Sequence, residues 1–195
     1  ENIEIAWSYL VLLQSIAKFL DKKHELGQYD EAFHHARLSL LHYAKWMLAN
    51  EYPYLDKPEI LEYPNETWAA QELRKAVVFY QAARYSDNPQ QQQAFQHQAR
   101  FFYQTAQEQL TSFTTSTTTR PVALMLQNGW IGTKLAEQSI KPVDCPASEL
   151  SSTWKPIPNL TLAQIGKRLA TETLEVLKVT SIKREVAWLK ARIKP

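Results

Sequence analysis

Glycine is scarce in this chain, with four residues among 195, against a usual share of roughly 7%. Because glycine supplies the positive-φ positions of tight turns, this scarcity argues against a β-rich fold. Helices are the natural alternative, and the chain is long enough to bury one substantial core. The sequence also lacks a glycine-rich phosphate-binding loop, which excludes the usual nucleotide-binding folds.

Cysteine, net charge and long hydrophobic runs are scarce as well. The single Cys145 excludes an intramolecular disulfide framework and fits a reducing, cytoplasmic compartment. The formal net charge of +2 lacks the basic excess of nucleic-acid-binding proteins, so we expect no nucleic-acid partner. The most apolar stretch, residues 5–20, contains Ser8, Gln14 and Lys18 and falls short of the roughly 20 apolar residues that span a bilayer. We expect a buried core helix there and no membrane partner.

The chain begins with ENIEIAWSYL, which contains neither an initiator methionine nor the features of a signal peptide. We therefore interpret residues 1–195 as a single all-helical domain that forms the C-terminal part of a longer chain. The remainder of that parent chain, or another protein, is a candidate partner.

Hydrophobic periodicity and capping residues together predict about seven helices. Asp30, Asn88 and Ser181 are the expected N-caps of three of them. A Ser/Thr-rich linker over 111–119 and a loop over 139–159 separate the later helices. The predicted helices cover residues 2–22, 30–50, 65–85, 88–111, 120–137, 161–179 and 181 onward.

The connections between these helices differ in length in a way that is typical of helical hairpins joined in series. The first, third and fifth helices are apolar around much of their circumference, whereas the fourth has a glutamine-rich face. We therefore expect the odd-numbered helices to lie inside and the even-numbered helices outside. If consecutive helices are antiparallel, all odd-numbered helices begin at one end of the bundle.

The segment YPNETWAAQELRK, residues 63–75, places a tyrosine, a carboxylate, a tryptophan and a basic pair at one helix start. This segment, together with the serial hairpins, resembles the six-hairpin glycosidase-like α/α toroids. The resemblance is architectural and covers most of the chain. It implies part of an α/α toroid that binds or processes carbohydrate, so a glycan is the candidate ligand.

The resemblance also implies roles for residues at the common end of the odd-numbered helices. Glycoside hydrolysis uses one carboxylic acid to protonate the leaving oxygen and a second carboxylate to activate water or to attack the sugar. The candidate catalytic pair is Glu66 and Glu4. The candidate substrate-binding residues are the aromatic Tyr63, Trp68 and Trp7 and the basic Arg74 and Arg120. The alternative is purely structural: Asn65 caps the helix, Glu66 stabilises its dipole and Trp68 belongs to the core.

Other candidate sites are weaker. His34, His35 and His42 lie on one predicted helix, but their spacing does not converge on one ion, so we expect no metal site. Cys145 has no identifiable histidine partner, and we expect no catalytic role for it. The sequons NET and NLT are expected to serve helix capping and not glycosylation. The sequence predicts no cofactor.

A second function remains open. The segment ELGQYDEAFHHA, residues 25–36, resembles the turn of a tetratricopeptide repeat. No matching turn follows 34 residues later, and such repeats need about three stacked units. A non-catalytic helical-repeat module that binds another protein is therefore the alternative to carbohydrate binding or processing.

Overall fold

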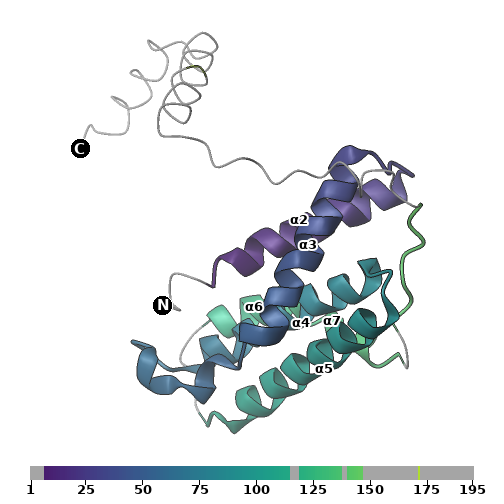
Figure 1. The fold of residues 1–195 in the computed structure, drawn as a ribbon. Coiled ribbons are helices and arrows are strands. Elements are labelled where there is room, and N and C mark those ends of the chain that lie inside the picture. Colours follow the sequence, from purple (N-terminus) through teal and green to yellow (C-terminus); the bar gives the residue numbers. More distant parts are fainter. Residues whose placement is uncertain (1–6, 115–118, 138–139, 147–170, 172–195) are drawn as a thin grey trace. The chain divides into compact units, whose positions relative to one another are not determined.

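The computed structural model describes residues 7–114, 119–137, 140–146 and 171. This part of the chain contains α-helices and two short 3-10 helices and has no β-strand, which confirms the predicted all-α class (Figure 1). Contacts between Cα atoms divide the chain into two units, residues 1–150 and 151–195. The described helices all belong to the first unit.

The first two described helices form a hairpin. Helix α2 spans Tyr9–Glu25 and α3 spans Glu31–Asn50. The turn between them contains Gly27, whose φ of 64° explains why glycine occupies this position. Asp30 caps α3 as predicted, because its side chain accepts a hydrogen bond from the backbone N–H of Phe33 at 3.0 Å.

A second hairpin follows a connection that contains two 3-10 helices, η1 (Tyr54–Asp56) and η2 (Pro58–Ile60). Helix α4 spans Glu66–Tyr85 and α5 spans Pro89–Ser112. The Asn65 side chain accepts from the backbone N–H of Thr67 at 2.9 Å, and that of Asn88 accepts from Gln91 at 3.0 Å. Both asparagines therefore act as helix caps, as the sequence predicted.

The predicted helix over 120–137 is interrupted, which corrects that prediction. It consists of α6 (Arg120–Asn128) and α7 (Ile131–Leu135), with a turn at residues 129–130. Gly129 has a low helix propensity. The Asn128 side chain bonds back to the carbonyl of Leu124 and also accepts from Gln14 of α2. Tertiary contacts thus end the helix at a point where the hydrophobic pattern continues.

The layering also differs from the expected alternation of inner and outer helices. Helix α4 lies at the centre, because α2, α3, α5, α6, α7 and η1 all pack against it. Helices α2 and α6 bury only one side and leave apolar residues such as Leu12 and Leu126 exposed. The first, third and fifth predicted helices, which are α2, α4 and α6, are therefore not equally internal, and among the described helices only α4 is surrounded. In α5, Phe95, Ala99, Phe102 and Ala106 face inward as expected.

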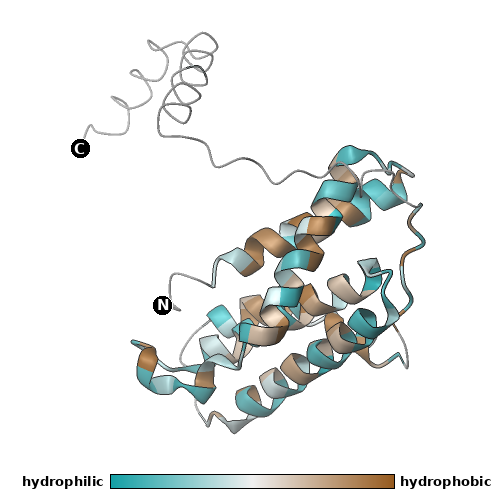
Figure 2. Cartoon of the chain, viewed as in Figure 1, coloured by the Kyte–Doolittle hydropathy of each residue, from teal (hydrophilic) through white to brown (hydrophobic). Residues whose placement is uncertain are grey.

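Several predictions lie outside the described residues. These are the helices over 161–179 and from 181 onward and most of the loop over 139–159, of which residues 140–146 have no regular secondary structure. Each described helix carries both hydrophobic and hydrophilic residues (Figure 2). None of the described helices combines the length and hydropathy that a membrane span requires.

Candidate functional site

Residues predicted to bind substrate gather around one cavity at the start of α4. Its volume is about 260 Å³. Four of the five predicted binding residues line it, and polar side chains of the first turns of α4 complete it. The lining, called the polar cavity below, consists of Trp7, Tyr63, Asn65, Thr67, Trp68, Gln71 and Arg120.

The aromatic residues of the polar cavity are held by local contacts. The indole N–H of Trp68 donates to the backbone carbonyl of Tyr63 at 3.1 Å. The Trp68 ring also packs against the Tyr54 ring, with 5.2 Å between the ring centroids. Tyr63 itself is 67% exposed. The rings of Trp68 and Tyr63 therefore occupy different environments, one packed and the other open to solvent.

Arg74 does not line the polar cavity but supports it. Its guanidinium lies 5.8 Å from the ring centroid of Trp7. It also donates to Gln71 within α4 at 2.9 Å, to Gln14 of α2 at 2.8 Å and to Gln127 of α6 at 3.4 Å. Because these bonds engage the guanidinium within the protein, Arg74 acts as a positioning residue for Trp7 and for three helices.

Of the two predicted catalytic carboxylates, the structure places only Glu66, and Glu66 does not line the polar cavity. Glu66 is 6% exposed and lies in the first turn of α4, but it is not among the lining residues. Its place at the positive end of the helix dipole stabilises α4. Glu4 lies outside the described residues.

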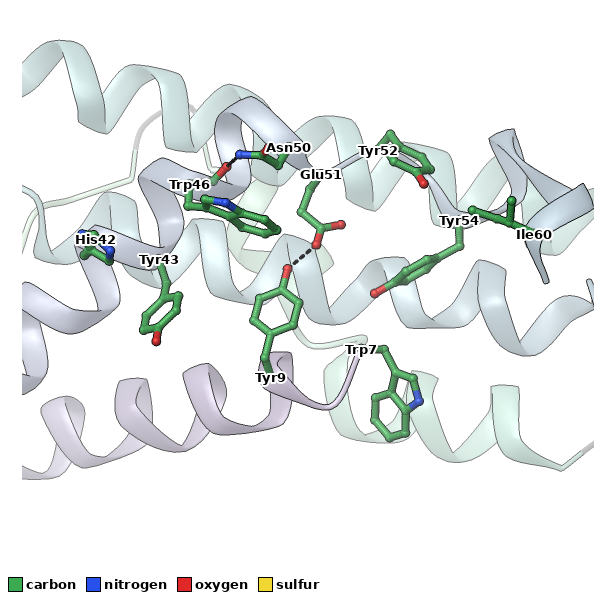
Figure 3. Close-up of a pocket in the computed structure, with 10 residues that line it drawn as sticks. All are labelled: Trp7, Tyr9, His42, Tyr43, Trp46, Asn50, Glu51, Tyr52, Tyr54 and Ile60. Carbon is green, nitrogen blue, oxygen red and sulfur yellow. Dashed lines mark hydrogen bonds between the residues drawn. The ribbon is translucent and has the colours of Figure 1, made fainter. Parts of the chain in front are cut away.

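A larger cavity lies beside the first and was not predicted from the sequence. Its volume is about 530 Å³. The residues come from the start of α2, the C-terminal half of α3 and the connection that leads to α4 (Figure 3). Six of the ten lining side chains are tryptophan or tyrosine. The lining, called the aromatic cavity below, consists of Trp7, Tyr9, His42, Tyr43, Trp46, Asn50, Glu51, Tyr52, Tyr54 and Ile60.

Glu51 is the acidic residue of the aromatic cavity. Its Oε1 accepts a hydrogen bond from the Tyr9 hydroxyl (Figure 3), and its Oε2 lies 3.0 Å from the ammonium of Lys75. Burial, and secondarily the negative charge of Glu51, raise the pKa of Tyr9 above its usual value. Tyr9 therefore stays protonated and remains a donor to Glu51.

Next to Glu51, Lys75 and Glu72 form a fully buried ion pair. Both side chains are 0% exposed, and Lys75 Nζ lies 3.1 Å from Glu72 Oε2. Lys75 also donates to the Tyr52 carbonyl at 2.5 Å, while Glu72 Oε1 accepts from the backbone N–H of Tyr54 at 2.7 Å. Desolvation outweighs the attraction of Lys75 and raises the pKa of Glu72 to about 7. One helix turn of α4 thus fixes the segment that lines the aromatic cavity.

Two sequence signals could have indicated the aromatic cavity. The segment EYPYLDKPEI, residues 51–60, concentrates aromatic residues and prolines in what looked like a plain connection. Glu72 and Lys75 are spaced i, i+3 and therefore share one helix face. Their burial, however, depends on which face of α4 meets the 51–60 segment, and that is a tertiary property.

Of the histidines and the cysteine considered as candidate sites, only His42 lines one of the two cavities. His34 is 7% exposed, whereas His35 and His42 are exposed, and the described residues contain no group of three or more side chains placed to hold a metal ion. Cys145 is a free, partly buried thiol packed against the core. Burial raises the pKa of Cys145, which disfavours the reactive thiolate.

Comparison of the chain with protein-family models, with curated proteins and with solved structures gave no match.

Proposed function

We propose that this domain binds carbohydrate at the polar cavity. The observation that supports the proposal is that Trp7, Tyr63, Trp68 and Arg120, from separate parts of the chain, line one cavity of about 260 Å³. An indole can cover the apolar C–H face of a sugar ring, while guanidinium and amide groups pair with its hydroxyl groups. A concave site that combines aromatic surface with a few convergent polar groups is typical of small-ligand recognition.

Binding is better supported than hydrolysis. Hydrolysis requires two carboxyl groups on either side of one glycosidic bond. Glu66 is buried and does not line the polar cavity, while Glu51 and Glu72 both lie against Lys75. The part of the chain that the structure describes therefore offers aromatic platforms and polar donors for a sugar. The carbohydrate-processing α/α toroid remains part of the proposal as the larger architecture in which such a site would operate.

A helical interaction module is the second candidate, and one observation favours it. Helix α6 exposes Val122, Met125 and Leu126, of which Leu126 is 82% exposed. Exposed apolar residues that gather on one helix face commonly mark a protein interface. The segment that resembles a tetratricopeptide repeat turn joins α2 and α3. Its Gly27 has the only positive φ among the described residues.

The test of carbohydrate binding is a titration of the purified chain with gluco-, manno-, galacto- and xylo-oligosaccharides of one to six units. We expect a saturable change in tryptophan fluorescence, confirmed by calorimetry, for at least one series. Arg120→Gln should weaken binding by roughly 1 to 3 kcal/mol because it removes a charged donor at an exposed rim. Trp68→Ala should abolish most of the affinity.

The matched control is Trp130→Ala. Trp130 is 43% exposed, packs edge-on against the buried Tyr80 and lines neither cavity, so its loss should leave glycan binding unchanged. Circular dichroism checks that each variant retains its helices. Absence of binding across all four series, with the wild-type chain folded, would refute the proposal and favour the interaction module.

A further inference from the structure

The two cavities are neighbours. Trp7 lines both of them, so its indole stands on their common border. A second link joins them, because Tyr54 of the aromatic cavity packs against Trp68 of the polar cavity with 5.2 Å between ring centroids. A ligand that extends beyond the polar cavity past Trp7 would therefore enter the aromatic cavity.

The electrostatics of the aromatic cavity disfavour a charged ligand. An organic cation would compete with ammonium groups already placed on ring faces, since Lys75 lies 3.5 Å from the Tyr54 centroid and Lys57 4.0 Å from that of Tyr52. An anion would meet the carboxylate of Glu51 in the lining. With Arg74 over Trp7, three cations accompany the two carboxylates, Glu51 and Glu72, so neither sign of charge is in large excess. The balance of charges favours an uncharged ligand.

One buried polar atom in this cavity lacks a partner. The Tyr54 side chain is 4% exposed, and its hydroxyl has no hydrogen bond within the described residues. Figure 3 shows this hydroxyl pointing toward the middle of the lining residues. Burial raises the pKa of Tyr54, so the hydroxyl stays protonated and can donate. A buried hydroxyl without a partner costs free energy, and a ligand hydroxyl that accepts its hydrogen bond would remove this cost.

Exposed aromatic surface completes the cavity. Trp46 and Tyr43 on α3 are 46% and 45% exposed, and the Trp46 ring stands edge-on to Tyr9 at 6.3 Å. Asn50 adds an amide beside them. Flat aromatic faces beside single polar groups suit a ligand whose apolar faces alternate with hydroxyl groups, as in a chain of pyranose rings.

We infer that the polar and aromatic cavities are adjacent subsites for one uncharged oligosaccharide that passes over Trp7. The aromatic cavity holds the sugar units beyond those in the polar cavity, and Tyr54 donates to one of their hydroxyl groups. This inference rests on the proposed carbohydrate binding, because the polar cavity supplies the first subsite.

The experiment measures affinity against ligand length, from one to six units, in whichever oligosaccharide series binds. For the wild-type chain we expect affinity to rise with length until both cavities are filled. Trp46→Leu should remove this gain and bind the longer ligands roughly three- to tenfold more weakly, while the affinity for the shortest ligand stays unchanged. Trp130→Leu is the matched control, because Trp130 is 43% exposed and lines neither cavity, and it should change neither affinity.

Tyr54→Phe provides a second readout that a purely structural role would not give. The substitution keeps the ring and removes only the unpartnered hydroxyl, so thermal stability should be retained or increased. Affinity for the longer oligosaccharides should nevertheless fall, and that for the shortest should not. Binding that is independent of length, or long-ligand binding insensitive to both Trp46→Leu and Tyr54→Phe, overturns the inference but leaves the proposed function standing. Absence of binding at every length refutes both.

Discussion

At the scale of single residues, the least expected feature is the pair of charged side chains at the centre of α4. Lys75 and Glu72 are both 0% exposed, and a second carboxylate, Glu51, shares the same ammonium. Removing charges from water is costly, and a buried pair is tolerated only where further hydrogen bonds complete it. Here the Tyr52 carbonyl and the Tyr54 amide provide those bonds. The network therefore attaches the 51–60 segment to α4.

The raised pKa of Glu72 predicts a specific pH dependence of stability. Its pKa is about 7 in the folded chain, against an ordinary value of 4.5. Between these values the folded chain binds the additional proton, so the free energy of unfolding should fall as pH rises from 4.5 to 7. Glu72→Gln removes this dependence. Urea unfolding at pH 5, 6 and 7 should show the wild-type stability falling by about 2 kcal/mol relative to the variant.

Comparing the wild-type chain with the Glu72→Gln variant separates the effect of Glu72 from that of other titrating groups. Asp30 and Asp87 have lowered pKa values because of Lys23 and Arg37, and both aspartates titrate below this window. A stability difference between wild type and Glu72→Gln that is constant from pH 5 to pH 7 would contradict the assignment.

At the scale of elements, helix starts are set by local chemistry and helix ends by packing. The caps Asp30, Asn65 and Asn88 each accept a backbone N–H from the first turn that follows. The break between α6 and α7, by contrast, brings Gly132 against Tyr103 of α5. A Cβ atom added at Gly132 would lie 2.1 Å from the Tyr103 hydroxyl oxygen. Any side chain at residue 132 would therefore require the Tyr103 ring to move.

Gly132→Ala should therefore destabilise the chain by roughly 1 to 3 kcal/mol through overpacking against Tyr103. In a Tyr103→Ala background the clash is absent, and the same substitution should be neutral or stabilising, because alanine favours helix by about 1 kcal/mol over glycine. A double-mutant cycle of chemical unfolding measures the coupling. An equal cost of Gly132→Ala in both backgrounds would show that the contact with Tyr103 is not its cause.

At the scale of the whole described unit, α4 is the helix against which every other described α-helix packs. Seventeen residues of α4 are buried, and its Phe79 stacks on Phe102 of α5 with 5.7 Å between centroids. Asp21 of α2 accepts from Gln81, Arg84 and Tyr85 near the other end of α4. Both cavities depend on this helix, since its first turns line one and Glu72 and Lys75 support the other.

This arrangement predicts an order of amide hydrogen exchange. Amides in the middle of α4 should exchange only on global unfolding, whereas those of α6, which exposes Val122, Met125 and Leu126, should exchange through local opening. Exchange followed by mass spectrometry on peptides 70–80 and 120–128 tests this order. Protection of α6 equal to that of α4 would contradict the central position of α4.

Much of the architecture follows from the sequence alone. The helical class, the caps at Asp30, Asn65 and Asn88 and the inward face of α5 depend on propensity, capping and periodicity, which act over a few residues. The grouping of Trp7, Tyr63, Trp68 and Arg120 also followed from antiparallel connectivity. These features are local, or need only the direction of each helix.

Tertiary packing decided the rest. The break at residues 129–130, the central place of α4 and the aromatic cavity all depend on which helix faces meet. The burial of Lys75 is the clearest case, because a lysine in a helix ordinarily extends its ammonium into water. The ammonium of Lys75 can be buried because the 51–60 segment brings a backbone carbonyl and a carboxylate within hydrogen-bonding distance of it.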